Sequence, residues 1–73
     1  MSREQTTIAI VVNGEPREVS PELTVLGLLH SLGLDPGRVA VELDRRIVRQ
    51  AEWPHTPLHT GSNLEIVQFV GGG

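Results

Sequence analysis

Cysteine and lysine are both absent from this chain of 73 residues, and aromatic residues make up only 3% of it. Without cysteine, the chain has no disulfide, no thiolate metal site and no cysteine nucleophile of its own, so its stability must come from packing. Without lysine, it offers no side-chain amine for a Schiff base or an isopeptide bond. A chain of this length is expected to form one small domain with a modest core.

Positive charge is also scarce. Six arginines are scattered along the chain against nine acidic residues, which gives a formal net charge of −3. Nucleic-acid-binding proteins gather positive charge in a patch or stripe, so nucleic acid is not expected as a partner. The longest apolar run near the polar N-terminus, residues 8–12, is too short for a signal peptide or a membrane span. We therefore expect a cytoplasmic protein without a membrane partner.

The first structured segment is a predicted β-hairpin. Residues 7–12 read TIAIVV, and a run rich in β-branched residues is typical of a strand. The run leads into Asn13-Gly14, the dipeptide best suited to a two-residue hairpin turn because both residues tolerate a positive φ. A return strand is therefore expected at about residues 16–19.

One amphipathic helix is expected next. Its apolar residues recur at helical spacing and form a single stripe: Val25, Leu28, Leu29 and Leu32. Thr24 is the expected N-cap, with Ser20 followed by Pro21 as a rival start, and Gly33 occupies the position of a left-handed C-cap. The helix should therefore be short and well delimited.

Two further strands follow a predicted turn at residues 35–37. Residues 39–44, VAVELD, alternate between apolar and polar, as a half-buried strand does. A tight turn at residues 44–46 leads to a short strand at 47–49, IVR. The helix is thus followed by two strands.

An irregular loop and a last strand complete the pattern. The loop, residues 50–63, holds two prolines and the only tryptophan, Trp53, which is expected to pack against the edge of the core. The last strand, residues 63–70, has apolar side chains on both faces: Leu64, Ile66 and Val70 on one, Val67 and Phe69 on the other. This predicts a central strand, or an outward face covered by a partner.

The predicted order is two strands, a helix, two strands, a loop and a final strand. This is an α+β pattern, a mixed sheet of about five strands with one main helix packed on one face. A last strand beside the first would give the β-grasp arrangement of ubiquitin, although the pattern alone does not fix the strand order. We expect residues 1–70 to form this single domain and residues 71–73 to form a flexible tail.

The histidines do not form a recognisable site. His30 falls off the apolar stripe of the helix and is expected at the surface. His55 and His59 have the i, i+4 spacing of a helical metal site, but neighbouring prolines disfavour a helix there and no third ligand adjoins them. No metal site is therefore predicted.

Acidic residues and serines are expected to be structural as well. Two acidic pairs should be solvated charges: Glu42 with Asp44, and Glu15 with Glu18. The serines lack the strained turn and neighbouring base that a nucleophile needs: Ser20, Ser31 and Ser62. No glycine-rich loop opens a helix as a phosphate-binding loop does. The sequence therefore predicts no self-contained active site.

The glycines at the end of the chain are the remaining candidate. Gly71, Gly72 and Gly73 directly follow the last strand. Because glycine has no Cβ, such a tail can enter a channel too narrow for a side chain, and three extended residues reach about 10 Å. Terminal glycines can equally be a frayed end or a cloning remnant. The functional interpretation makes the α-carboxylate of Gly73 the reactive group.

Four stretches of the chain resemble a known family. They are TVLGLL at 24–29, VAVELD at 39–44, IV with Trp53 five residues on, and GSNLEIVQFVGGG at 61–73. In these stretches the chain resembles the ThiS family of thiamine-biosynthesis sulfur carriers, small β-grasp proteins that end in an apolar strand and two or three glycines. The resemblance runs from about Ile8 to Gly73. Three positions depart from it, at turns and before the last strand: Asp44, Arg49 and Ser62.

The resemblance implies a sulfur carrier rather than an enzyme. A ThiF-type adenylyltransferase would use ATP and magnesium to convert the Gly73 carboxylate to an acyl-adenylate. A persulfide donor, such as a cysteine desulfurase, would then displace AMP and lead to a thiocarboxylate. Thiazole synthase, a ThiG-like enzyme, would take this sulfur for the thiazole ring of thiamine. Gly71 and Gly72 would be the flexible approach, and the chain would bind no cofactor itself.

The enzymes of this pathway would need a docking surface on the carrier. We expect an apolar patch made of Phe69, Val67 and Leu26, because all three are predicted to point outward. A lone phenylalanine in a small domain is often a core residue instead. Both locations therefore remain open for Phe69 at this point.

Rival interpretations share the tail or the fold. The MoaD-like small subunit of molybdopterin synthase resembles this chain in fold, tail and activation chemistry, and carriers for tRNA thiolation or cysteine synthesis are related. A ubiquitin-like modifier would instead be joined through Gly73 to lysines of other proteins. A binding module without covalent chemistry would not need Gly72 and Gly73 at all. The short chain and the ending FVGGG favour the ThiS-like interpretation.

Overall fold

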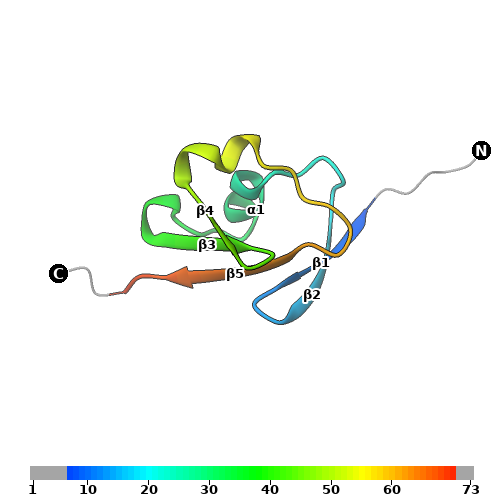
Figure 1. The fold of residues 1–73 in the computed structure, drawn as a ribbon, viewed down its shortest axis with the longest axis horizontal. Helices are drawn as coiled ribbons and strands as arrows, with labels where there is room; N and C mark the ends of the chain where they lie inside the picture. Colours follow the sequence, from blue (N-terminus) through cyan, green and yellow to red (C-terminus); the bar gives the residue numbers. More distant parts are fainter. Residues whose placement is uncertain (1–6, 71–73) are drawn as a thin grey trace, which may run out of the picture.

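The structure is a computed structural model that describes residues 7–70. These residues form five strands, one α-helix and two short 3-10 helices (Figure 1). The strands are β1 (Ile8–Val12), β2 (Glu15–Val19), β3 (Val39–Leu43), β4 (Arg46–Val48) and β5 (Asn63–Gln68). The helices are α1 (Val25–Ser31), η1 (Pro36–Arg38) and η2 (Gln50–His55). The predicted α+β class is therefore confirmed.

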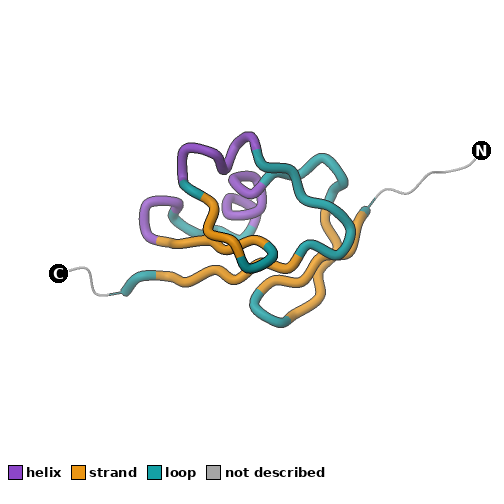
Figure 2. The backbone as a smooth tube through the Cα atoms, viewed as in Figure 1, coloured by secondary structure: helices purple, strands orange, loops and turns teal. Residues whose placement is uncertain are grey.

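The five strands form one mixed sheet in the order β2-β1-β5-β3-β4. The last strand lies at the centre, where it pairs parallel to β1 and antiparallel to β3. The two hairpins β1-β2 and β3-β4 flank it on either side, and α1 and η2 lie on the same side of the sheet (Figure 2). This is the β-grasp arrangement, which the sequence pattern had left open.

The core fills the space between the sheet and α1. Its most deeply buried side chains come from both layers: Ile10, Val25, Leu28, Leu29, Val41, Leu58 and Leu64. Trp53 of η2 is also buried, with 2% of its surface exposed, and its Nε1–H donates to the Val48 carbonyl oxygen at 2.9 Å. The predicted packing of Trp53 against the core is thus confirmed, and its polar group is satisfied.

Two tight turns have the left-handed geometry that joins antiparallel strands with the correct twist. Asn13 and Gly14 have φ values of 51° and 82°, as the Asn-Gly dipeptide predicted. Asp44 and Arg45 adopt the same pair of conformations, with φ values of 52° and 72°. The second turn therefore places an arginine where glycine is the preferred residue.

The helix α1 begins and ends with local hydrogen bonds. Thr24 is the N-cap: its Oγ1 accepts from the Gly27 N–H at 3.1 Å, so the rival start at Ser20 is wrong. Gly33 has a φ of 74°, and its N–H donates to the His30 carbonyl at 3.0 Å. The Leu34 N–H then donates to the Leu29 carbonyl at 3.0 Å, which completes a Schellman motif.

Three predicted segments differ from the structure. The last strand ends at Gln68 instead of Val70, so Val70 does not continue the strand face of Leu64 and Ile66 and is 85% exposed, because no strand of the sheet pairs with it. The turn at residues 35–37 is the start of η1, and the loop after β4 begins with η2.

Among residues 7–70, no helix is long and apolar enough to cross a membrane.

Candidate functional site

The predicted tail, residues 71–73, lies outside the described residues, so the described part of the site is the strand that leads to it. β5 begins at Asn63 in the middle of the sheet and runs toward the C-terminus between β1 and β3 (Figure 1). Its position fixes where residue 70 leaves the domain. The functional question is therefore how β5 is held and what surrounds its end.

On the β3 side, β5 is held along its full length. At its start, the Asp44 N–H donates to the Asn63 carbonyl at 2.8 Å, and the Asn63 N–H donates to Asp44 Oδ1 at 3.0 Å. At its end, the Phe69 N–H donates to the Arg38 carbonyl at 2.7 Å. The pairing therefore continues one residue beyond the strand, to the turn that precedes β3.

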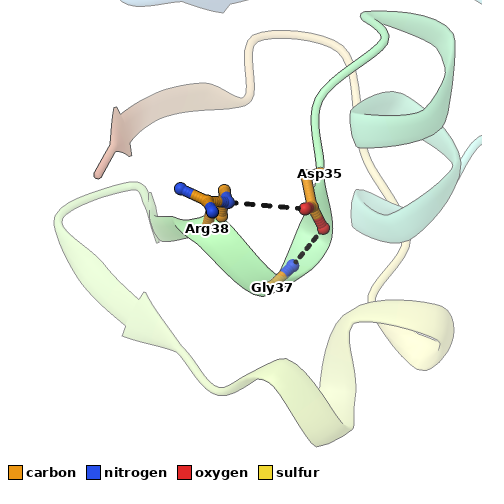
Figure 3. Close-up of polar contacts among 3 residues, drawn as sticks. All are labelled: Asp35, Gly37 and Arg38. Carbon is orange, nitrogen blue, oxygen red and sulfur yellow. Dashed lines mark hydrogen bonds and ion pairs between the residues drawn. The ribbon is translucent and has the colours of Figure 1, made fainter. Parts of the chain in front are cut away.

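Figure 3 shows how that turn is shaped. Asp35 is the N-cap of η1, and its Oδ1 accepts from the Gly37 N–H at 2.9 Å. Asp35 Oδ2 also lies 3.8 Å from Arg38 Nε, in an exposed ion pair that contributes little by itself. The cap matters more, because it fixes the 3-10 turn whose last carbonyl, that of Arg38, holds Phe69.

On the β1 side, the support for β5 is shorter. The Val11 N–H donates to the Ser62 carbonyl at 2.9 Å, and the Asn13 N–H donates to the Leu64 carbonyl at 2.8 Å. The Asn13 side chain then bonds Ile66 twice: its Oδ1 accepts from the Ile66 N–H at 2.7 Å, and its Nδ2 donates to the Ile66 carbonyl at 3.2 Å. Asn13 thus extends the pairing by one step beyond β1.

The face of the sheet opposite α1 carries exposed apolar side chains. Val67 is 57% exposed and Phe69 is 53% exposed, which excludes the core location that the sequence left open for Phe69. Val67 lines a shallow depression together with residues of β3 and β4: Ala40, Glu42 and Ile47. Ile47 is 77% exposed, and no pattern in the sequence marks it as part of a surface patch. Docking by Val67 and Phe69 stays a prediction.

Leu26 does not belong to this surface. It lies on α1, half-buried, and packs against the core on the opposite side of the sheet. The prediction that Leu26 points outward is wrong. In addition to the buried stripe of Val25, Leu28 and Leu29, α1 packs Leu26 against the core. The structure therefore does not bring together the three residues of the expected patch.

The remaining polar candidates do not converge on a site. The three histidines are exposed: His30, His55 and His59. Within residues 7–70, no group of three or more His, Cys, Asp and Glu residues could hold a metal ion. Ser62 is buried, but its Oγ accepts from the His59 N–H at 2.9 Å, which assigns it to the turn before β5.

Residues that sequence reasoning missed are those that position β5. Glu42 and Asp44 are exposed, as expected of solvated charges, and Glu42 also lies directly opposite Glu65 of β5, which the sequence could not show. The Arg38 carbonyl has no sequence signature, because any residue carries that atom. The side-chain role of Asn13 also could not be found, because its partner Ile66 is 53 residues away.

Comparison with known proteins places this geometry in a family. The model of the ThiS family matches residues 10–73. A thiazole synthase from Paramagnetospirillum magneticum is 44% identical over 64 residues, which is 88% of this chain but only 20% of that protein. The crystal structure of a thiamine biosynthesis protein (ThiS) from Geobacter metallireducens superposes with a TM-score of 0.78 at 30% identity, covering 90% of this chain and all of that one.

A more distant solved structure supports the fold alone. The ubiquitin-like domain of yeast Ddi1 has a TM-score of 0.59 at 17% identity and covers 99% of this chain and all of that one. The family match is the more specific finding, because it spans most of the chain and includes β5 and the three glycines after it. The chain belongs to the ThiS family.

Proposed function

We propose that this protein is a sulfur carrier of thiamine biosynthesis and that the carboxylate of Gly73 is the group that carries the sulfur. The observation that carries the proposal is the ThiS family match, which continues through β5 to residue 73. On this proposal the protein is a co-substrate of partner enzymes, in the cytoplasm where ATP is available, and it binds no cofactor itself.

The proposed chemistry begins with activation, because a carboxylate is a poor electrophile. A ThiF-type adenylyltransferase with ATP and magnesium joins the Gly73 carboxylate to AMP and releases pyrophosphate. A partner persulfide then attacks the carbonyl carbon, and AMP leaves with the electron pair of the broken C–O bond. A second thiol cleaves the resulting S–S bond, which leaves a thiocarboxylate on Gly73 and a disulfide on the partner.

The composition of the chain fits this chemistry. An acyl-adenylate reacts with any nearby thiolate or amine, and the chain has no cysteine and no lysine. Its own side chains therefore offer no strong nucleophile that would compete for the activated carbonyl. Gly71 and Gly72 lack a Cβ, so they would let Gly73 enter a narrow channel in each partner.

We propose thiazole synthase as the enzyme that receives the sulfur. The support is that a relative named thiazole synthase contains a segment 44% identical to this chain within a much longer protein. A carrier-like segment that shares a chain with the rest of such a protein is held close to it by linkage, which raises its effective concentration. In the present protein, docking would have to supply that proximity.

The proposed docking surface consists of Val67 and Phe69, and we call it the C-terminal patch. Both side chains are more than half exposed, and both lie within six residues of Gly73. Aromatic side chains at the centre of an interface often contribute most of its binding energy. A patch beside the outgoing chain would place each enzyme near the carboxylate that it modifies.

Intact mass spectrometry tests the function. The protein is incubated with a ThiF-type adenylyltransferase, magnesium ATP and a persulfide source, and the C-terminal peptide is then sequenced. We expect one oxygen to be replaced by sulfur at Gly73, with no change without ATP or in a chain lacking Gly73. Conjugates of higher mass with other proteins would indicate a ubiquitin-like modifier instead. An unchanged mass with a competent enzyme would contradict the proposal.

A further inference from the structure

The main-chain N–H and C=O groups of β5 point alternately toward its two neighbouring strands, β3 and β1. Odd-numbered residues bond the β3 side, as the contacts of Asn63 and Phe69 show. Even-numbered residues therefore direct their N–H and C=O groups toward β1. The Leu64 carbonyl accepts from the Asn13 N–H at 2.8 Å, and Ile66 exchanges two bonds with the Asn13 side chain. The next residue with this orientation is Gln68.

Among residues 7–70, none pairs with Gln68 on the β1 side. β1 ends at Val12, and the Asn13 side chain, which occupies the next place, already bonds Ile66. Opposite Gln68 on the other side lies Val39, in a pair whose main-chain groups point away from each other. Within residues 7–70, no contact from the β1 side satisfies the N–H or C=O of Gln68, and the residue is exposed.

An exposed N–H and C=O on one side of an extended segment are a template for another strand. The surroundings suit an extended peptide with alternating side chains. The C-terminal patch presents Val67 and Phe69 on the face opposite α1. On the α1 side, Asn13 lines a shallow depression together with three apolar residues, Val12, Leu32 and Leu34, and two charged ones, Glu15 and Arg17. A strand added beyond Asn13 would find apolar contacts on both faces.

We propose that the enzyme that modifies Gly73 adds an extended segment of its own chain along the β1 side of β5, with hydrogen bonds to the N–H and C=O of Gln68. This rests on the proposed function for the identity of the partner. The segment continues the line of β1 beyond Asn13 and makes the partner part of the carrier's sheet. Such pairing depends on main-chain groups, so one surface can serve enzymes of unrelated sequence.

The length of the chain after Gln68 favours an enzyme as the occupant. Gln68 and Gly73 are five residues apart, a span of at most about 17 Å when fully extended. An enzyme whose active site holds Gly73 must therefore lie close to the free side of Gln68. A second copy of this chain could pair there only through one short stretch, which buries less surface than a stable interface needs.

Two substitutions of Gln68 separate the main chain from the side chain. Gln68→Pro removes the N–H, and it breaks no hydrogen bond of the described residues 7–70, because none of them accepts from that N–H. Gln68→Ala keeps the N–H and shortens the side chain. We expect the proline variant to bind the ThiF-type adenylyltransferase at least tenfold more weakly and the alanine variant to bind within twofold of the unmodified protein. Equal binding by both variants would overturn the proposal.

Amide hydrogen exchange measured by NMR gives a second readout that does not depend on how proline changes the backbone. In the free protein, the Gln68 amide should exchange rapidly, whereas the Phe69 amide, bonded to Arg38, should be protected. On binding the adenylyltransferase, the Gln68 amide should become protected at least tenfold. A Gln68 amide that stays unprotected in the complex would overturn the strand addition.

Other outcomes separate this proposal from the proposed function. Sulfur gain at Gly73 in the mass experiment, with Gln68 unprotected in the complex, would leave the function standing and refute strand addition. No sulfur gain would remove the proposed partner and the inference with it. A dimer could also protect the Gln68 amide. If protection rose with protein concentration in the absence of enzyme and the mass were that of a dimer, a second copy of the chain would occupy the β1 side of β5, and the proposal would be refuted.

Discussion

The side chain of Asn13 bonds both main-chain groups of Ile66, a residue 53 positions further along the chain. Asn13 also holds the left-handed position of the β1-β2 turn, with a φ of 51°. One residue thus closes a local hairpin and joins it to the central strand. The two roles can be separated by substitution, because glycine satisfies the first and not the second.

Replacing Asn13 should therefore destabilise the domain in two steps. Asn13→Gly keeps the turn and loses both side-chain bonds, and we expect it to lower the free energy of unfolding by about 1–2 kcal/mol. Asn13→Ala also places a Cβ residue at a positive φ and should cost about 1 kcal/mol more. Urea unfolding measures both values. A glycine variant as stable as the unmodified protein would mean that the bonds to Ile66 contribute nothing.

Arg45 occupies the second left-handed position of the β3-β4 turn, where the other hairpin has Gly14. Arg45→Gly removes the unfavourable contact of a Cβ at positive φ, which outweighs the greater freedom of glycine in the unfolded chain. We expect the free energy of unfolding to rise by about 0.5 kcal/mol. The matched control is Arg46→Gly, in β4, which should lower it by about 0.5–1 kcal/mol. Equal losses in both variants would contradict this explanation.

Phe69 should contribute to binding and little to stability. More than half of its side chain is exposed, so Phe69→Ala should change the free energy of unfolding by less than about 0.5 kcal/mol. The same variant should bind the ThiF-type adenylyltransferase at least about tenfold more weakly, as expected for an aromatic residue within an interface. Thermal unfolding and calorimetric titration test the two halves. Lost stability with retained binding would refute the docking role.

Leu26→Ala is the opposite case, because Leu26 is half-buried against the core on the far side of the sheet. We expect it to lower the free energy of unfolding by about 1–2 kcal/mol and to leave binding of the adenylyltransferase unchanged below the melting temperature. Weaker binding at full stability would place α1 in the interface. The C-terminal patch would then be only part of the docking surface.

Gly72→Ala tests the need for a tail without side chains. The core is built from residues between Ile10 and Ile66, so the unfolding free energy should not change. On the proposed function, the rate of thiocarboxylate formation should fall at least about tenfold, because a methyl group would have to enter a channel fitted to glycine. Single-turnover mass spectrometry measures this rate. An unchanged rate would mean that the partner's channel accepts a Cβ at this position.

The features that could be predicted from sequence are those that depend on neighbouring residues. The Asn13-Gly14 turn and the cap at Thr24 are chemical signals within a few residues, and both are confirmed. The parallel pairing of Val11 with Asn63 is not local, so the strand pattern could not fix it. Val70 was expected on the same face as Ile66 in a strand that reached residue 70, but β5 ends at Gln68 because its partner strand β3 begins at Val39.

The residues of the candidate site could be named from the sequence, whereas the geometry around them could not. The glycines and the neighbouring Val67 and Phe69 could be read directly from the order of residues. Which side of β5 remains unpaired depends on where β1 ends and on a side-chain contact across 53 positions, and no pattern in the sequence carries that information. Leu26 was wrongly predicted to be exposed for a similar reason, because the burial of each side chain of a short helix depends on how the helix packs on the sheet.

The central position of β5 also governs when the domain can assemble. The sheet joins Ile8–Val12 and Val39–Leu43 only through Asn63–Gln68, so a nascent chain that lacks this segment cannot close its core. Such long-range pairing is slow compared with helix or hairpin formation. The sheet therefore cannot assemble until β5 is available to pair with both hairpins. An enzyme that binds along β5, as proposed above, would therefore select chains in which the whole sheet has assembled.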